Sequence, residues 1–403
     1  MINYNKILSS TVRDIKPSGI RKFFDIANTM EDVISLGVGE PDFRTPWQVR
    51  SAGIHSLEQS NTRYTSNKGL ESLRDEISVY TERKYGVSYD PKTEILVTVG
   101  GSEAIDMTIR AITEPGDEII IPQPSYVCYE PITRLSGGVP VIIHTKAEND
   151  FKVTPEELKQ AISPRTKALI LPYPCNPTGG IMEREDLEKL ADILKDTDII
   201  VISDEIYAEL TFDNIKHTSV PSIPGMKERT VLINGFSKTF SMTGWRLGYA
   251  CAPEPLLNEI TKIHQYAIMC APTVSQYAAI EALRSCDDVV RDMVEEYDMR
   301  RKLIVKGFNQ LGLTCREPKG AFYAFPSIQS TGLSSEEFCE RLLYSKKVAV
   351  VPGTAFGDSG EGFIRASYCY SLAHIEKALH LIGEFLEELK KEREKTANTG
   401  VKK

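Results

Sequence analysis

Short runs of apolar, often β-branched residues alternate with amphipathic segments between residues 94 and 234, and this alternation limits the folds open to the chain. The first run, 94–99 (EILVTV), ends at Gly100-Gly101, and residues 102–112 behind it have helical spacing. Residues 183–194 place leucines at helical intervals. Five further runs predict strands: 118–121, 140–144, 168–171, 199–203 and 230–234. Apolar strands that alternate with helices predict an α/β fold whose sheet is parallel or mostly parallel and covered by helices.

The C-terminal part has a different character. A long helix is predicted over about 287–311, followed by short strands at 320–325, 348–351 and 362–367 and a final helix from Leu372. These elements predict a smaller α+β domain, against which the segment before Pro46 is expected to pack. We therefore predict a large domain at 46–295 and a small domain made of 1–45 plus 296–403.

Composition excludes several classes of function. The chain has 403 residues and a net charge of −8, which gives no electrostatic footprint for nucleic acid. Its eight cysteines form no CxxC pair, and they and the six histidines are dispersed, so no metal site is predicted. The N-terminus lacks the apolar core of a signal peptide, and no apolar run is long enough to span a membrane. These features predict a cytoplasmic protein with free thiols.

Polar residues follow the predicted strands at their carboxyl ends, where open α/β sheets bind ligands. Gly100, Gly101 and Ser102 stand at a helix N-terminus, which suits a phosphate, although a glycine pair also marks a tight turn. No GxGxxG follows a strand, so the dinucleotide fingerprint is absent. Three more groups follow later strands: Asn176-Pro177-Thr178-Gly179; Asp204, Glu205 and Tyr207; and Ser237, Lys238 and Arg246.

Each of these groups has a structural explanation when it is taken alone. The asparagine–proline pair can be a simple turn, Glu205 can be a solvated or structural ion-pair partner, and Lys238 can lie in a polar turn. Together they place phosphate-binding groups, a buried carboxylate, an amine and a phenol at one edge of the sheet. A ligand that uses all of them has a phosphate, an aldehyde and a basic ring nitrogen. Pyridoxal 5′-phosphate has these three features.

The chain resembles a class I aminotransferase of fold type I, and the resemblance extends from about Ile34 to the last helix. That resemblance implies a mostly parallel seven-stranded sheet between helices in a large domain, with a smaller α+β domain. The residues that carry the resemblance are Gly39-Glu40-Pro41-Asp42, Tyr64, Gly100-Gly101-Ser102, Tyr126, Asn176-Pro177-Thr178-Gly179, Ser203-Asp204-Glu205-Ile206-Tyr207, Ser237-Lys238, Gly244-Trp245-Arg246-Leu247-Gly248 and Arg365.

The resemblance assigns five residues to the ring of the cofactor. Lys238 would form the Schiff base with the aldehyde, and Asp204 would pair with the pyridinium nitrogen. Asn176 and Tyr207 would hydrogen-bond the phenolic oxygen, while Tyr126 would stack on the ring. Lys238, Asp204 and Tyr207 are therefore the predicted catalytic residues.

A second set is implied for the phosphate. Backbone groups of Gly101 and Ser102, with Ser237 and Arg246, would hold it. Ser102 departs from the several relatives that carry lysine there, but this contact is mostly through the backbone. Tyr64 would reach the phosphate of a neighbouring subunit, which implies a homodimer with shared active sites.

The substrate α-carboxylate would be bound by Gly39 and Arg365, with Asn176 beside them, and the arginine would form a bidentate pair. The implied reaction is amino transfer between an L-amino acid and 2-oxoglutarate, with no metal. The stretches 18–23 and 264–266 resemble enzymes acting on aspartate, aromatic amino acids or N-acetyl-diaminopimelate. No second arginine is obvious for a dicarboxylate side chain, which favours aromatic or broad donors, unless the other subunit supplies a cation.

Two other functions are compatible with parts of this sequence pattern. A pyridoxal-phosphate carbon–sulfur β-lyase on the same scaffold stays open, because lyases of this group also bind the α-carboxylate through an arginine. A cofactor-sensing regulator would need a helix-turn-helix domain ahead of the pattern. The pattern already begins near Ile34, so this class is disfavoured.

Overall fold

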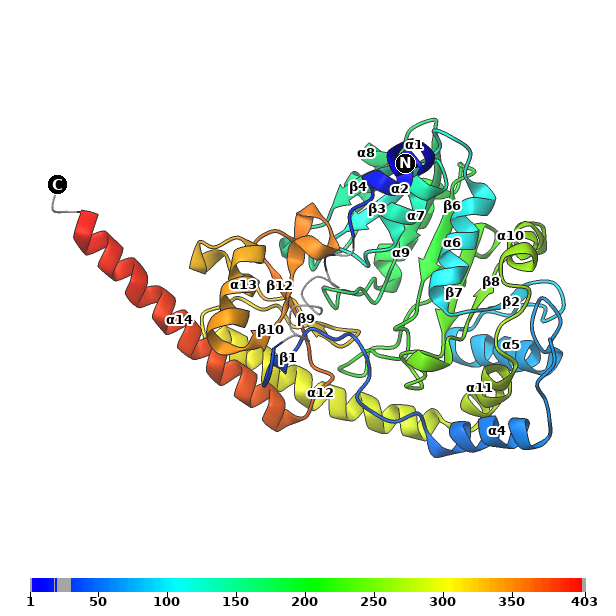
Figure 1. Ribbon diagram of the computed structural model, residues 1–403. Coiled ribbons are helices and arrows are strands. Elements are labelled where there is room, and N and C mark those ends of the chain that lie inside the picture. The colour runs from blue at the N-terminus through cyan, green and yellow to red at the C-terminus, as the bar shows by residue number, and fades with distance from the viewer. Residues whose placement is uncertain (1, 18, 20–29, 401–403) are drawn as a thin grey trace.

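The main sheet has the predicted architecture. The computed structural model describes residues 2–17, 19 and 30–400, and its side chains as far as residue 395 (Figure 1). Its seven strands run in the order β2-β8-β7-β6-β5-β3-β4, and all are parallel except β8, which pairs antiparallel with both neighbours. The strands are β2 (Ile95–Thr98), β3 (Glu118–Gln123), β4 (Val139–His144), β5 (Thr166–Leu171), β6 (Ile200–Asp204), β7 (Thr230–Gly235) and β8 (Gly248–Cys251).

Helices cover both faces of this sheet (Figure 1). The α/β class and the seven-stranded sheet are therefore confirmed. The helices of this half are α4 (Trp47–Glu58), α5 (Glu71–Tyr85), α6 (Gly101–Ile112), α7 (Tyr129–Leu135), α8 (Pro155–Ala161), α9 (Arg184–Leu194), α10 (Glu254–Ala267) and α11 (Thr273–Ser285).

Successive side chains of each central strand enter cores on opposite faces. Ile202 of β6 packs in the core under α6 and α10, whereas its neighbour Val201 packs with α8 and α9. Val231 and Leu232 of β7 divide between two cores in the same way. Each such buried side chain contributes about 1.5–3 kcal/mol relative to exposure. Burial on both faces explains why these strands read as continuous apolar runs.

The C-terminal half contains the long helix α12 and two small sheets. The prediction of 287–311 for this helix is confirmed within one residue, and the final helix begins at Leu372 as expected and extends away from the body of the molecule (Figure 1). The elements are α12 (Asp287–Gln310), β9 (Tyr323–Ala324), α13 (Ser335–Lys346), β10 (Val348–Ala349), β11 (Val351–Pro352), β12 (Ile364–Ser367) and α14 (Leu372–Gly400).

Two predicted strands of this half are shorter than expected. The strand predicted at 320–325 is reduced to β9, because Ala321 before it has a φ of 59° and leaves the extended conformation. The strand predicted at 348–351 is divided between β10 and β11, which pair with different partners.

The N-terminal segment is divided between the two halves. Strand β1 (Ile34–Ser35) pairs in parallel with β10, as expected for packing on the C-terminal part. The short helices α1 (Tyr4–Ile7) and α2 (Ser10–Asp14) lie by the other half, where α2 contacts α7 (Figure 1). The expectation that this whole segment packs on the C-terminal part is thus wrong for α2. Residue 18 and residues 20–23 of the substrate-related stretch lie outside the described residues. The domain limits stay a prediction.

Strand β8, which sequence reasoning missed, begins at the edge of the sheet where the parallel strands end. Its sequence, GYAC, has no β-branched residue, so its strand propensity is low although all four residues are buried. Gly248 at its start touches the N-terminus of α6: a Cβ added there would lie 2.7 Å from the Gly100 carbonyl carbon and 2.8 Å from the Gly101 nitrogen.

We expect Gly248→Ala to lower the free energy of unfolding by about 1–3 kcal/mol, because backbone must move to accept the methyl group. The matched control is Gly244→Ala, four residues away, where an added Cβ meets no atom within 4 Å. That control should stay within about 0.5 kcal/mol of the wild type. Equal denaturation midpoints for the two variants would contradict the close packing of β8 on α6.

Candidate active site

Asp204 is a buried carboxylate without a positive partner. It ends β6 and is 7% exposed; its Oδ2 accepts a hydrogen bond of 2.6 Å from the Tyr129 hydroxyl, and its Oδ1 accepts one of 3.3 Å from the Ile206 N–H. In the described part of the chain, no lysine, arginine or histidine nitrogen forms an ion pair with it. Burial raises the pKa of Asp204 above its ordinary value, only partly opposed by the Tyr129 hydroxyl. A cation in contact with this carboxylate would remove that penalty.

The neighbouring carboxylate, Glu205, is fully engaged within the protein. Its Oε2 lies 2.7 Å from His217 Nε2, and its Oε1 accepts from the Ser203 hydroxyl and the Val220 N–H. Glu205 is completely buried in this network. It is therefore a structural ion-pair partner, one of the two alternatives weighed from the sequence, and Asp204 is left as the unpaired carboxylate of the strand end.

Lys238 follows β7, the strand next to β6. Its Nζ donates a hydrogen bond of 2.8 Å to the Gly39 carbonyl and lies 5.8 Å from the centre of the Phe322 ring. Desolvation by burial lowers the pKa of Lys238 to about 8, and nearby charged groups have smaller effects in both directions. A lysine with such a pKa is a nucleophile near neutral pH, because a useful fraction of its amine is uncharged.

Arg365 on β12 is a buried cation without an acidic partner among the described residues. It is 2% exposed, and its Nη1 donates to Asn176 Oδ1 at 3.0 Å and its Nη2 to the Gly37 carbonyl at 2.5 Å. Its guanidinium lies between the rings of Tyr323 and Phe356, at 4.5 and 4.8 Å from their centres. Nε is buried without a hydrogen-bond partner. Burial lowers the pKa of Arg365, so a carboxylate ligand would be stabilising here.

The N-terminus of α6 faces Arg246 across Gly100. Gly100 has a φ of 77°, and a Cβ on it would lie 2.9 Å from Arg246 Nη2. Arg246 reaches this edge because it immediately precedes Leu247 and the antiparallel strand β8. A helix N-terminus beside a guanidinium is a site for a phosphate. Ser237 is buried at the end of β7, and its neighbour Lys238 is the amine described above.

The remaining predicted residues take different positions. Tyr207 is buried, and its hydroxyl lies 2.9 Å from that of Tyr323. Tyr126 is half-buried with its ring edge-on to Tyr129. Tyr64 lies in the loop after α4 and is 81% exposed. Its predicted contact with a partner subunit stays a prediction.

Sequence reasoning missed two tyrosines of the site. Tyr129 bonds Asp204 from the start of α7, and Tyr323 bonds Tyr207 from β9. Tyr129 follows the predicted Tyr126 by three residues, and this spacing could have drawn attention to it. No local sequence signal marks Tyr323, because its partner is 116 positions away.

The site fits pyridoxal 5′-phosphate on its own contacts. The unpaired Asp204 suits a ring nitrogen that carries a proton, the Lys238 amine with its lowered pKa suits an aldehyde, and Gly100 with Arg246 suits a phosphate. Among the described residues, no group of three His, Cys, Asp or Glu side chains could hold a metal ion. Within the same residues, no helix is both long and apolar enough to cross a membrane.

Comparison with known proteins agrees with this geometry. A family model described as aminotransferase class I and II matches residues 31–382. The chain is 54% identical over 379 residues to the putative aminotransferase YugH of Bacillus subtilis, covering 94% of this chain and 98% of that protein. It is 46% identical to an aspartate aminotransferase of Pyrococcus abyssi, covering 93% and 97%. A crystal structure of an aromatic aminotransferase from Pyrococcus horikoshii superposes with a TM-score of 0.88 at 44% identity, covering 91% and 99%.

We expect the cofactor-free protein to react with added pyridoxal 5′-phosphate at a rate that follows the uncharged fraction of Lys238. Between pH 6 and 7 that rate should rise about tenfold, and it should level off above pH 8, because the pKa of this lysine is about 8. Stopped-flow absorbance measures the rate. Lys238→Ala is the control and should show no covalent reaction. A rate that keeps rising to pH 10, as for an exposed lysine, would contradict the burial argument.

Proposed function

Because the chain belongs to the class I and II aminotransferase family, which depends on pyridoxal 5′-phosphate, we propose that it transfers the amino group of an aspartate or aromatic L-amino acid to 2-oxoglutarate. One observation supports the assignment of its site above all. Among the described residues, Asp204 is a buried carboxylate without a cation and Arg365 a buried guanidinium without an anion, and we assign both to one site with the Lys238 amine. The cofactor ring and the substrate carboxylate would satisfy both charges.

When bound, the cofactor supplies an aldehyde and a ring that accepts the electron pair left when the Cα–H bond of the substrate breaks. Asp204 would keep a proton on the ring nitrogen. Raising the pKa of a pyridine by about two units requires roughly 2.7 kcal/mol. A carboxylate at about 4 Å provides on the order of 4 kcal/mol at an effective dielectric of 20, before desolvation is subtracted. One carboxylate is therefore sufficient, and Tyr129 would hold it in orientation.

Lys238 would have two tasks. Its amine would hold the cofactor covalently while the enzyme rests. When its amine is free, Lys238 would be placed to move a proton between the substrate Cα and the cofactor's C4′ carbon. A base held in place for such a transfer is worth up to about 7–11 kcal/mol in ideal cases. Arginine could not do this, because it stays protonated.

Arg365 would bind the α-carboxylate of both substrates. Asn176 and the Gly37 carbonyl already fix its two terminal nitrogens, and the rings of Tyr323 and Phe356 fix its plane. The guanidinium is thus oriented before the substrate arrives, which lowers the entropy lost on binding. Gly39, whose carbonyl accepts from Lys238, would lie beside the same carboxylate.

The donor side chain is proposed from the names of similar proteins and from the sequence. Similar proteins carry the names aspartate aminotransferase and aromatic-amino-acid aminotransferase. No second arginine for a dicarboxylate was evident in the sequence, which favours aromatic or broad donors. N-acetyl-diaminopimelate is a third candidate donor, since a similar protein is named as a probable N-acetyl-LL-diaminopimelate aminotransferase. We also propose a homodimer in which the exposed Tyr64 reaches the phosphate site of the partner.

A panel of L-amino acids with 2-oxoglutarate tests the reaction. We expect glutamate to form with aspartate or an aromatic donor, and Lys238→Ala to lose turnover entirely together with the covalently bound cofactor. Borohydride reduction and mass spectrometry would locate that bond on the peptide that contains Lys238. If every donor fails and cysteine or cystathionine gives pyruvate and ammonia without an acceptor, the β-lyase alternative replaces this proposal.

Asp204→Asn keeps the shape of the side chain but removes its charge. The pKa of the ring nitrogen would then fall by about two units, so we expect kcat to fall about 100-fold. Cofactor content, measured by alkaline release, should stay near one per chain, because the phosphate and lysine contacts are intact. Near-normal turnover would mean that another group protonates the nitrogen.

A further inference from the structure

Tyr323 touches three of the predicted site residues at once. Its hydroxyl lies 2.9 Å from the Tyr207 hydroxyl, and its ring supports the Arg365 guanidinium at 4.5 Å. A Cβ added to Gly39 would lie 2.3 Å from the Tyr323 hydroxyl oxygen. Tyr323 is 1% exposed. A single side chain is therefore in contact with the residues proposed for the cofactor and with those proposed for the substrate carboxylate.

The chain segments that carry Tyr207 and Tyr323 are tied together by backbone. The Ala321 N–H donates to the Leu210 carbonyl at 2.9 Å, and the Phe212 N–H donates to the Lys319 carbonyl at 3.1 Å. The first bond lies two residues before Tyr323 and three after Tyr207, and the second lies four before and five after. The separation of the two hydroxyls is thus set by main-chain contacts, which are stiffer than contacts between side chains.

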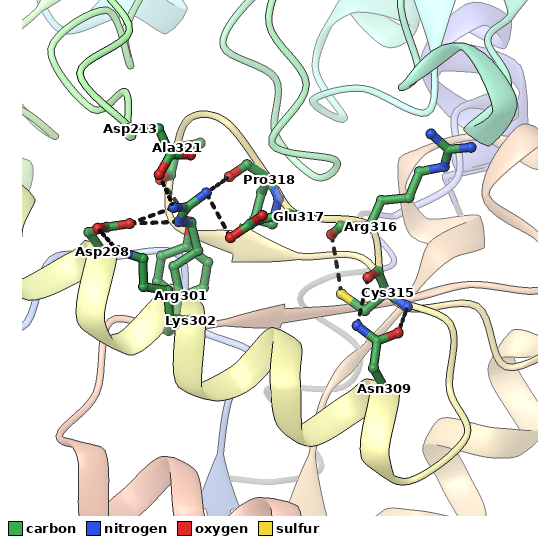
Figure 2. Close-up of polar contacts among 11 residues, drawn as sticks. Asp213, Asp298, Arg301, Lys302, Asn309, Cys315, Arg316, Glu317, Pro318 and Ala321 are labelled. Atoms are coloured by element: carbon green, nitrogen blue, oxygen red, sulfur yellow. Dashed lines mark hydrogen bonds and ion pairs between the residues drawn. The ribbon is translucent and has the colours of Figure 1, made fainter.

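Arg301 reinforces the same junction from α12. Figure 2 shows its guanidinium directed at Asp213, Asp298 and the turn at Glu317 and Pro318. Its side chain is fully buried, with hydrogen bonds of 2.8 Å to Asp213 Oδ1 and 3.0 Å to the Pro318 carbonyl. One buried guanidinium therefore links the loop after Tyr207 to the turn before Tyr323.

The shared hydrogen bond has two possible directions, and they have opposite consequences. If Tyr207 donates to Tyr323, the Tyr207 proton is turned away from the cofactor. If Tyr323 donates, the Tyr207 proton is free for an acceptor in the site, and the accepted bond strengthens Tyr207 as a donor. Only the second arrangement agrees with a Tyr207 that bonds the phenolic oxygen of the cofactor.

On this basis, and resting on the proposed function, we infer that Tyr323 is a positioning residue of the reaction. Its hydroxyl donates to Tyr207 and so directs the Tyr207 proton to the phenolic oxygen of the cofactor. Its ring face holds Arg365 for the substrate carboxylate. Tyr323 itself touches no reacting atom. The two functions can be separated, because a phenylalanine keeps the ring and loses only the hydroxyl.

The test is a pH titration of the visible absorbance of the cofactor-loaded enzyme, which reports the proton that the phenolic oxygen shares. In Tyr323→Phe, this titration should move upward by about 0.5 to 1 pH unit, because the deprotonated oxygen loses part of its donor. The KM of the amino donor should stay within about twofold, since Arg365 keeps its ring support. Tyr89→Phe is the matched control, and its titration should equal that of the wild type. Tyr89 is also buried, and its hydroxyl has no hydrogen-bond partner among the described residues.

Two further variants make the inference falsifiable. Tyr207→Phe should raise the titration, and adding Tyr323→Phe to it should raise it no further, because Tyr323 acts through Tyr207. Gly39→Ala, which displaces the same hydroxyl by steric contact, should shift the titration in the direction seen for Tyr323→Phe.

A downward or absent shift in Tyr323→Phe, or shifts that add in the double variant, would overturn the inference while leaving the aminotransferase assignment intact. A wild-type enzyme that forms glutamate from no donor and shows no titrating absorbance would instead overturn the proposed function, and the inference with it.

Discussion

The site depends on one electrostatic constraint: the buried carboxylate at the end of β6 has no cationic partner among the residues that the structure describes. The side chains of β6 before Asp204 are apolar or hydrogen-bonded to other residues, and Glu205 is bonded to His217. The fold tolerates Asp204 through one phenol and one N–H. That is little compensation for a buried charge, so a positive ring held against Asp204, as proposed above, would stabilise the folded protein.

The antiparallel strand β8 brings Lys238 and Arg246 to the same edge of the sheet, the edge proposed for the cofactor's phosphate. In a fully parallel sheet, each strand leaves the ligand edge by a helix and returns from the far side. Because β8 runs the other way, the chain leaves β7, passes Lys238 and Arg246, and re-enters the sheet at the same edge. The amine and the guanidinium are therefore separated by one short turn. A parallel β8 would place a whole crossover between them.

Much of this was predictable from sequence, and the failures have physical causes. The strands buried on both faces were found because their apolar runs have no other explanation, and the polar residues at their ends followed from the topology of such sheets. Strand β8 was missed because glycine, alanine and cysteine give no strand signal. Tyr323 was missed because its role arises from a tertiary contact. Asp204 and Glu205 are carboxylates that follow the same apolar run, and the structure distinguishes them because Glu205 is bonded by His217, Ser203 and Val220.

Strand β1 has a mechanical consequence. The stretch 37–39 that follows it offers one carbonyl to Arg365 and another to Lys238, while β1 itself is bonded to β10 of the C-terminal half. Ser367, two residues after Arg365, also donates its N–H to the Leu36 carbonyl. Because β1 is bonded to β10, a rotation of the C-terminal half would also move residues 37–39. The Gly39 carbonyl, which accepts from the Lys238 amine, would move with them. In the cofactor-free protein, the hydrogen bond between the Lys238 amine and the Gly39 carbonyl thus depends on how the C-terminal half is arranged against β7.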